Sequence, residues 1–325
     1  MAVRNQKMAD DYVLYEGDCC EVLPDLPDAS VGFSVFSPPF ADLYSYTDQT
    51  EDMSNVKSYK DFFDHFEFLV KELMRLIMPG RVVAVHCMDL MMFKRDGNEI
   101  GLRDFSGDLL RCFQDHGFIY HSRHCVWKDP LIAATRTKAI GLAHKQIVKD
   151  SAICRTGLPD YILAVRKPGE NPNPIRHPKG FTQYCGSRSV PHDLDKWIDS
   201  DEPRINKRSH WIWQQYASPV WFDIRQSRVL PFREAKDEDD TKHICPLQLG
   251  VIRRLVKLYT NPGEVVFSPF AGIGSEGYES IKLGRRFYGC EIKPEYIKAA
   301  KANMKRAEKI AALENRTLFD TSGTT

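Results

Sequence analysis

A glycine-rich turn near the C-terminal end of the chain is the feature that most restricts its fold. Residues 264–277 read Glu-Val-Val-Phe-Ser-Pro-Phe-Ala-Gly-Ile-Gly-Ser-Glu-Gly, which predicts a strand, a tight turn and the start of a helix. Gly272, Gly274 and Gly277 match G-x-G-x-x-G, a pattern that lets a ligand approach the backbone beside the N–H groups of a helix N-terminus. A second strand follows and ends at Glu291, a position suited to accepting hydrogen bonds from two ribose hydroxyls. The turn therefore predicts a nucleoside site.

The position of this turn determines the order of the fold. Only 48 of the 325 residues follow Gly277, enough for one helix, one strand and a terminal helix. The remaining strands must come from the N-terminal part, so the nucleoside-binding half comes last in the chain. We predict a circularly permuted α/β sheet, an order unusual for dehydrogenases. Glycines that serve only a strand–helix turn would satisfy the same pattern, so other features of the sequence must decide whether the turn binds a nucleoside.

Short β-rich runs alternate with longer amphipathic segments. We expect seven strands, at residues 12–15, 31–36, 81–86, 118–127, 161–166, 264–267 and 286–290. Apolar residues recur at spacings of three and four in the segments where we expect the main helices, at residues 58–77, 103–116, 247–259 and 295–315. This alternation predicts parallel βαβ units covered by helices on both faces.

Residues 167–241 interrupt the alternation. They are rich in Pro, Gly, Asn, Arg and Trp, show no sustained period, and end near the acidic run Asp237–Asp240. We predict an insertion of irregular or small mixed structure here. It divides the chain into three regions, at residues 1–166, 167–241 and 242–325.

Composition excludes several classes of protein. Hydrophobic residues make up 42% and charged residues 27% of the chain, which excludes a disordered or fibrous chain. The 45 Lys and Arg residues nearly balance the 44 Asp and Glu residues, so the chain is not a uniform polycation. No apolar run approaches the length of a membrane span, and residues 1–11 lack the apolar segment of a secretory signal. We expect a cytoplasmic protein with no membrane partner.

Nine cysteines are scattered along the chain, and no Cys-x-x-Cys pair occurs among them. This spacing disfavours a structural zinc site and fits a reducing compartment. His116, His121 and His124 lie near Cys125, but their spacing suits the alternating faces of a strand, and no second cluster completes four ligands. We expect these residues to be structural and predict no metal.

A proline-rich turn follows the expected strand at residues 31–36. Ser37, Pro38, Pro39 and Phe40 combine a hydroxyl, two prolines and an aromatic ring. Because proline fixes φ and has no N–H group, the turn is rigid and leaves carbonyl groups without a local donor. A hydroxyl, bare carbonyl groups and an aromatic face suit a planar amino group attached to a heterocycle. The same tetrapeptide could also serve only to end a strand.

Taken together and in this order, the motifs resemble those of the amino-methylating DNA methyltransferases with permuted, β-type motif order. The resemblance covers roughly residues 12–166 and 242–300. It is carried by Ser37–Phe40, the lead-in at 16–31 that contains Asp18, the segment His243–Gln248 with Pro246, the loop Ser268–Gly274, and Glu291. The loop departs from the common family form at Ser268, where Asp is usual.

The resemblance implies a circularly permuted, Rossmann-like, S-adenosylmethionine-dependent methyltransferase fold with a seven-stranded, mostly parallel sheet. It makes residues 1–166 the catalytic half, 167–241 a target-recognition insertion and 242–325 the cofactor-binding half. The catalytic residues that it implies are Ser37, Pro38, Pro39 and Phe40. The residues that it implies for binding S-adenosylmethionine are Asp18, Pro246, Phe270, Ala271, Gly272, Gly274 and Glu291.

The implied reaction is site-specific methylation of double-stranded DNA. Ser at the first motif position favours the N4 amino group of cytosine, because Asp or Asn commonly opens the motif in adenine enzymes. N6-adenine methylation by the same family stays open as the alternative. We expect direct transfer to a flipped-out base with no covalent enzyme intermediate. The sequence leaves open whether a restriction endonuclease accompanies the enzyme or whether it is a solitary or phage-type enzyme.

Two stretches carry local positive charge suited to DNA phosphates, although solvated loops can carry the same charge. In residues 123–149 six basic residues accompany a single Asp: Arg123, Lys128, Arg136, Lys138, Lys145 and Lys149. In residues 203–233 six more accompany a single Asp: Arg204, Lys207, Arg208, Arg225, Arg228 and Arg233. The tryptophans between His210 and Phe222 could stack on bases, but we favour a small satellite core.

Three other functions fit parts of the sequence. Methylation of a planar amine in RNA or in a protein glutamine would use a similar Pro-Pro-aromatic site. A catalytically silent DNA-binding module would explain the basic stretches, but not Ser37–Phe40 together with the glycine loop. An NAD-dependent oxidoreductase is the weakest candidate, because the sequence places no hydride-handling pair.

Overall fold

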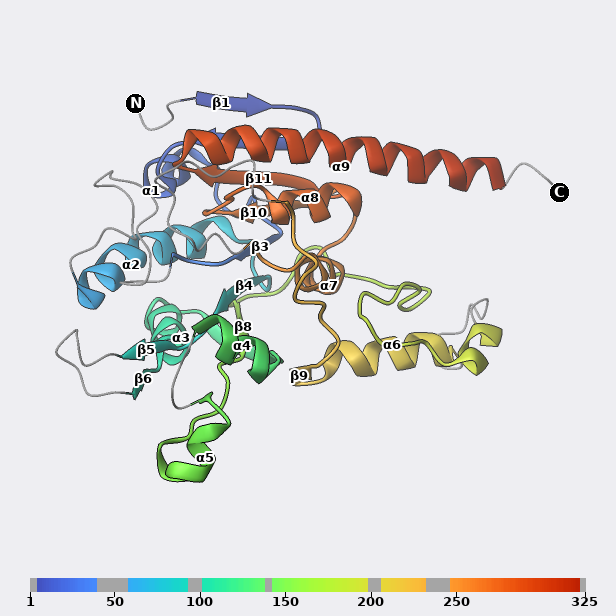
Figure 1. The fold of residues 1–325 in the computed structure, drawn as a ribbon. Coiled ribbons are helices and arrows are strands. Elements are labelled where there is room, and N and C mark those ends of the chain that lie inside the picture. The colour runs from blue at the N-terminus through green and yellow to red at the C-terminus, as the bar shows by residue number, and fades with distance from the viewer. Residues whose placement is uncertain are drawn as a thin grey trace.

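The computed structural model describes residues 5–39, 58–92, 101–137, 142–197, 206–231 and 246–321. Within these ranges the main sheet has nine strands in the order β1-β2-β11-β10-β3-β4-β8-β7-β9 (Figure 1). In chain order they are β1 (Asn5–Met8), β2 (Tyr12–Glu16), β3 (Phe33–Phe36), β4 (Val82–Cys87), β7 (Ile119–Val126), β8 (Asp160–Arg166), β9 (Val220–Trp221), β10 (Val265–Ser268) and β11 (Arg286–Glu291). Strands β2, β11, β10, β3 and β4 are parallel neighbours, whereas β8 is antiparallel to both β4 and β7.

All seven expected strands are present, and two short edge strands extend the sheet. Strand β1 is polar and fully exposed, so it has none of the apolar alternation that would predict it. Strand β9 is only two residues long and pairs with the end of β7. The expected mostly parallel α/β sheet is therefore wider at both edges than the sequence indicated.

Helices cover both faces of this sheet, as expected from the alternation of elements. One buried cluster joins α2 (Tyr59–Leu76) and α3 (Phe105–Asp115) to one face, and a second joins α7 (Leu249–Tyr259), α8 (Ser275–Lys282) and α9 (Pro294–Thr321) to the other. Side chains alternate between the two clusters along β4, where Ala84 and Val85 belong to different ones. The smaller elements are α1 (Cys19–Val22), η1 (Leu23–Asp25), β5 (Leu90–Met92), β6 (Gly101–Arg103), α4 (Pro130–Thr137), α5 (Lys145–Lys149), η5 (Ser151–Ile153), η6 (His192–Trp197) and α6 (Lys207–Ala217).

The permuted order brings two distant parts of the chain together at the centre of the sheet. Strand β10 pairs in parallel with β3, with Phe267 opposite Ser34. The Ser34 hydroxyl donates to the Phe267 carbonyl at 3.0 Å, across 233 positions of sequence. Because the two strands are parallel, the segments that follow them leave the sheet at the same edge.

The insertion does not form the separate satellite core expected from its tryptophans: Trp221 belongs to the main buried cluster with α7, α8 and α9, and Trp213 is 57% exposed. Trp221 and Tyr216 are buried, and the Arg254 guanidinium of α7 lies 4.6 Å from the centroid of each ring. Arg254 also pairs with Asp223 at 2.8 Å, which compensates its buried charge. The insertion thus packs on α7, with α6 and β9 as its regular elements.

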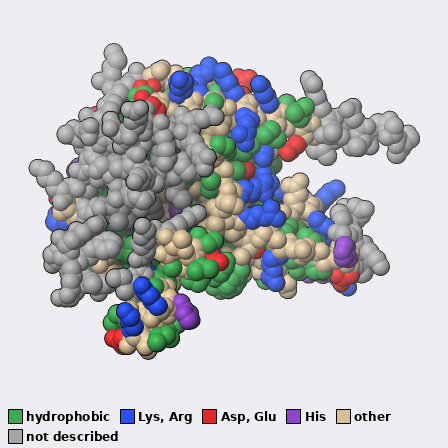
Figure 2. All heavy atoms as spheres, viewed as in Figure 1, with side chains coloured by type: hydrophobic (Ala, Val, Ile, Leu, Met, Phe, Trp, Pro, Cys, Tyr) green, Lys and Arg blue, Asp and Glu red, His purple; other side chains and the backbone are tan. Residues whose placement is uncertain are grey.

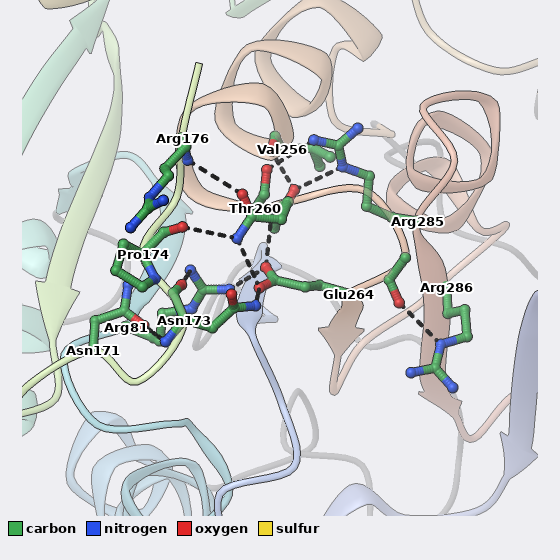
Figure 3. A network of polar contacts seen from close by, with 12 residues as sticks. Arg81, Asn171, Asn173, Pro174, Arg176, Val256, Thr260, Glu264, Arg285 and Arg286 are labelled. Carbon is green, nitrogen blue, oxygen red and sulfur yellow. Dashed lines mark hydrogen bonds and ion pairs between the residues drawn. The ribbon is translucent and has the colours of Figure 1, made fainter. Parts of the chain in front are cut away.

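A polar network ties the start of the insertion to the edge of the sheet where β4 and β10 begin (Figure 3). Arg81, whose side chain is fully buried, pairs with Glu264, and Glu264 also accepts from Asn173 at 2.6 Å. Asn261 donates to the Pro174 carbonyl at 3.3 Å. These contacts hold both halves of the core and the insertion together at the edge opposite the glycine loop.

None of the helices in the described ranges combines the length and apolar character needed to cross a membrane.

Candidate active site

The proline-rich turn and the glycine loop lie side by side. Phe36, the last residue of β3, and Phe270, in the loop after β10, are in edge-to-face contact with ring centroids 5.8 Å apart. Ser37 follows Phe36 directly, and Pro38 is buried. The structure therefore brings Ser37, Pro38 and Pro39 to the same edge as Phe270, Ala271 and Gly272. Phe40, the fourth predicted catalytic residue, lies outside the described residues.

Two glycines shape the turn after β10. Gly272 and Gly274 have φ of +52° and +83°, a conformation that side chains disfavour. A Cβ at Gly274 would lie 2.6 Å from Met304 of α9, so this glycine permits close packing. A Cβ at Gly272 would meet no atom of the described residues within 4 Å, so no described side chain covers this part of the turn.

The carboxylate of Glu291 lies beside this turn. It accepts from the Gly272 N–H at 2.8 Å and from the Lys293 N–H at 2.9 Å. Asp18 lies on the neighbouring strand connection, where its carboxylate caps α1 by accepting from the Cys20 N–H at 2.9 Å. The adjacent Gly17 N–H donates to the Glu291 carbonyl at 3.0 Å, so the segment containing Asp18 is held beside Glu291.

Pro246 lies near the same edge of the sheet, just before the start of α7. It precedes α7, and α7 ends next to Glu264, at the edge where β10 begins. Because β10 then runs back to the glycine loop, the start of α7 lies at the loop edge. The Leu249 N–H donates to the Arg228 carbonyl at 3.0 Å, which links this corner to the insertion.

A buried acid lies at the start of α8. Glu276 is only 5% exposed, and burial, together with the negative charge of Glu291, raises its pKa from 4.5 to about 8 despite an opposing backbone hydrogen bond. This corner combines the glycine turn after β10, a strand-end carboxylate at Glu291 and a buried acid. A strand-end carboxylate that can accept from ribose hydroxyls, beside a glycine turn, fits the adenosine part of S-adenosylmethionine.

The family model described as DNA methylase, N6_N4_Mtase, matches residues 31–302. The chain belongs to this DNA methylase family. It is therefore an S-adenosylmethionine-dependent DNA methyltransferase of the group that modifies the amino groups of cytosine or adenine, as the motifs predicted.

Named relatives and solved structures agree with this assignment. The chain is 23% identical to the type II methyltransferase M.BglII of Bacillus subtilis over 88% of its own length and 67% of that protein. It is 24% identical to the orphan methyltransferase M.BamHII of Bacillus amyloliquefaciens, over 86% and 91% of the two chains. Its fold resembles that of the PvuII DNA methyltransferase (cytosine-N4-specific), with a TM-score of 0.58, 15% identity and 95% coverage of both chains. The Thermus thermophilus protein TTHA0409, solved in complex with S-adenosyl-L-methionine, gives a TM-score of 0.59 at 23% identity, with 91% and 95% coverage.

The candidate site contains a chain of polar side chains that the sequence did not reveal. Ser37 Oγ lies 2.5 Å from His86 Nδ1, and His86 Nε2 lies 3.3 Å from Asp160 Oδ2. The other Asp160 oxygen pairs with Lys128. We call these four residues the polar chain. The one available signal in the sequence was His86, a single polar residue near the end of the buried strand Val82–Cys87, and it does not identify the partners.

Several predicted DNA-contacting residues are exposed at the described surface, whereas others are engaged within the protein. Lys145, Lys149, Arg225 and Arg228 are exposed. Lys128 instead pairs with Asp160. The predicted residues Lys138, Arg204 and Arg233 lie outside the described residues, as does the side chain of Arg136. His124 stacks on Trp221 at 4.4 Å, a contact that suits the predicted structural role of this histidine.

A polar cavity of about 370 Å³ lies away from this site. Its lining includes Arg208, Arg253 and Lys282, in the region of α7 and α8 beneath α9 where Figure 2 shows Lys and Arg side chains gathered. Arg253 pairs with the buried Glu279 at 2.6 Å. Lys282 ends α8, on the side opposite the glycine loop that begins it. The cavity is therefore separate from the methyl-transfer site.

Proposed function

We propose that this DNA methyltransferase modifies the N4 amino group of cytosine at the Ser37–Pro38–Pro39 turn. The observation that carries the proposal is the contact of Phe36 with Phe270, because that turn and the glycine loop, to which we assign the cofactor, then lie side by side. Ser at the first motif position favours cytosine. The PvuII enzyme, named cytosine-N4-specific, has the same fold, whereas the Escherichia coli DNA adenine methyltransferase YhdJ matches only 49 residues, at 43% identity.

The protein contributes hydrogen-bond acceptors and position to the reaction. The Ser37 hydroxyl oxygen and the Pro38 carbonyl accept the two hydrogens of the target amine, which draws its lone pair out of conjugation with the ring. S-adenosylmethionine, when bound, supplies an electrophilic methyl group on a sulfonium sulfur. The attacking amine is neutral, so the protein needs no strong base before transfer. Positioning and exclusion of water then provide most of the rate enhancement.

The cofactor is held by residues from both halves of the chain. We assign the ribose hydroxyls to Glu291, the backbone approach to Ala271, Gly272 and Gly274, and the methionine end to the corner formed by Asp18, Pro246 and Phe270. Replacing Glu291 with Ala should weaken S-adenosylmethionine binding by about 2 kcal/mol, the loss of charge-assisted hydrogen bonds. Calorimetry would measure this, and Ser37→Ala is the matched control, expected to bind cofactor normally.

The DNA surface extends from this edge toward the insertion. The side chains of Trp127 and Phe222 are 43% and 66% exposed. The backbone N–H of Trp127 donates to the Trp221 carbonyl at 3.1 Å. The two rings therefore follow neighbouring strands at the same edge of the sheet. Arg225 and Arg228 are exposed just beyond Phe222. Aromatic rings flanked by cations suit bases and phosphates of DNA that opens at the target. We assign target recognition to residues 167–241 on this basis.

Nucleoside mass spectrometry tests the substrate. Double-stranded DNA incubated with the protein and S-adenosylmethionine should yield N4-methylcytosine, and Ser37→Ala should lower that yield much more than it lowers cofactor affinity. N6-methyladenine without N4-methylcytosine would show that the base assignment is wrong. Methyl incorporation into RNA or protein, with none into DNA, would overturn the proposed function as a whole.

A further inference from the structure

Three side chains behind Ser37 continue the site into the protein interior. In the polar chain, His86 lies between the hydroxyl of Ser37 and the carboxylate of Asp160. Both His86 and Asp160 are buried, at 9% and 2% exposure. A histidine whose two ring nitrogens face partners of different type has one preferred tautomer. The polar chain therefore determines whether the Ser37 hydroxyl donates its proton to His86 or accepts a proton from it.

The charge on Asp160 selects the tautomer. Burial alone would raise the pKa of Asp160, but His86 and Lys128 beside it oppose this, and the net pKa is lowered. An ionised carboxylate only accepts hydrogen bonds. His86 Nε2 lies at an ion-pair distance of 3.3 Å from Asp160 Oδ2 and has no hydrogen-bond partner among the described residues. The favourable arrangement places the ring proton on Nε2, toward this negative charge.

With its proton on Nε2, His86 is an acceptor at Nδ1. Ser37 then donates its hydroxyl proton to Nδ1 across 2.5 Å, and the lone pairs of Oγ remain for another donor. In the opposite tautomer Ser37 would accept from Nδ1, and the lone pair of Nε2 would face the Asp160 carboxylate. The observed contacts therefore orient the Ser37 oxygen as an acceptor, which is what binding of an amino group requires.

We propose that His86 is a positioning residue that holds Ser37 in its amine-accepting orientation and takes up a proton through Ser37 after methyl transfer. The inference rests on the proposed function of Ser37 and deepens it. Lys128 and Asp160 complete the arrangement, because Lys128 fixes the carboxylate that faces Nε2.

The proton has a complete route along these atoms. A newly methylated amine carries one proton more than the neutral product. Its N–H bond breaks, the electron pair stays on nitrogen, and the proton moves to Ser37 Oγ as the Oγ proton moves to His86 Nδ1. The imidazolium that results donates from Nε2 toward Asp160. After product release, the Nδ1 proton returns to water through the Ser37 hydroxyl, and the neutral ring is restored.

Nitrogen NMR of the ligand-free protein tests the orientation directly. In protein labelled with ¹⁵N-histidine, the His86 signals are identified by their absence from His86→Gln. We expect Nε2 to be protonated and Nδ1 to be unprotonated. Asp160→Asn offers an amide donor to Nε2 and should move the proton to Nδ1. Protonated Nδ1 in the wild-type protein, or an unchanged tautomer in folded Asp160→Asn, would overturn the proposal.

Single-turnover kinetics test the proton uptake. Gln at position 86 can accept a hydrogen bond from Ser37 but cannot take up a proton. His86→Gln should therefore lower the methyl-transfer rate by about 100-fold or more, with S-adenosylmethionine and DNA affinities unchanged. His65→Gln, on the exposed side of α2, is the matched control and should leave the rate unchanged. A wild-type rate in His86→Gln would restrict His86 to a structural role.

The two experiments separate this proposal from the proposed function. The tautomer measurement needs neither DNA nor methyl transfer, so it reports on the polar chain even if the protein methylates no DNA. Conversely, DNA methylation that is unaffected by His86→Gln would leave the proposed function intact and remove His86 from it.

Discussion

Replacing Glu276 with Gln should stabilise the protein at alkaline pH much more than at acidic pH. The Glu276 carboxyl is buried at the start of α8, with a pKa of about 8 in the folded protein against an ordinary value of 4.5. The pKa of Glu276 is higher in the folded protein than in the unfolded chain. Its protonated form therefore contributes its full stability below pH 4.5, and this contribution is lost as the pH rises through 8. Gln keeps the shape of the protonated acid and does not ionise.

The magnitude follows from proton linkage. Between the two pKa values, the free energy of unfolding of the wild-type protein falls by about 1.4 kcal/mol per pH unit on account of this group. From pH 6 to pH 8 the stability difference between Glu276→Gln and wild type should therefore grow by roughly 2 to 3 kcal/mol. Over the full interval the change approaches about 4 to 5 kcal/mol.

Urea denaturation at pH 6, 7 and 8, followed by circular dichroism, measures this difference. Glu295→Gln is the matched control, because it makes the same chemical change at an exposed position in the first turn of α9. A difference between Glu276→Gln and wild type that stays constant within about 0.5 kcal/mol would refute the reasoning, since burial would then not penalise the charged acid.

Three further substitutions test other parts of the molecule. Arg81→Met leaves the buried Glu264 without its cation and should cost about 3 kcal/mol of unfolding free energy by urea titration, with cofactor affinity unchanged because the pair lies at the far edge. Gly277→Ala would place a Cβ 2.4 Å from the Phe287 ring and should cost about 1–3 kcal/mol; an unchanged denaturation midpoint would contradict the packing described. Trp127→Ala should weaken DNA binding by about 1–3 kcal/mol in a fluorescence anisotropy titration, with melting temperature and cofactor affinity unaffected.

The sequence predicts the central architecture because its signals are local and strong. Most of the predicted strands are apolar runs bounded by turn residues, and the predicted helix at 58–77 appears as α2, capped at Ser58. The meeting of Ser37 with the glycine loop also follows from sequence, because parallel strands end at one edge. Strand β1 and helix α6 lack such signals: the first is polar and exposed, and the second mixes tryptophans with polar residues without a clear apolar period.

The polar chain could not be predicted for a different reason. His86 is one polar residue in a buried apolar strand, and Asp160 begins another strand 74 positions later; only the antiparallel pairing of β4 with β8 brings them together. Such contacts depend on register, which the pattern of apolar residues does not specify for a strand buried on both faces.

The pairing of β3 with β10 also bears on how the protein is made. A ribosome releases β3 more than two hundred residues before β10, so until β10 emerges the nascent chain carries only part of the proposed site and an unpaired central strand edge. Contacts of such long sequence separation form late and slowly. The enzyme is consequently inert until β10 has been synthesised, and a product truncated before β10 would lack the proposed cofactor loop and have an open sheet prone to aggregation.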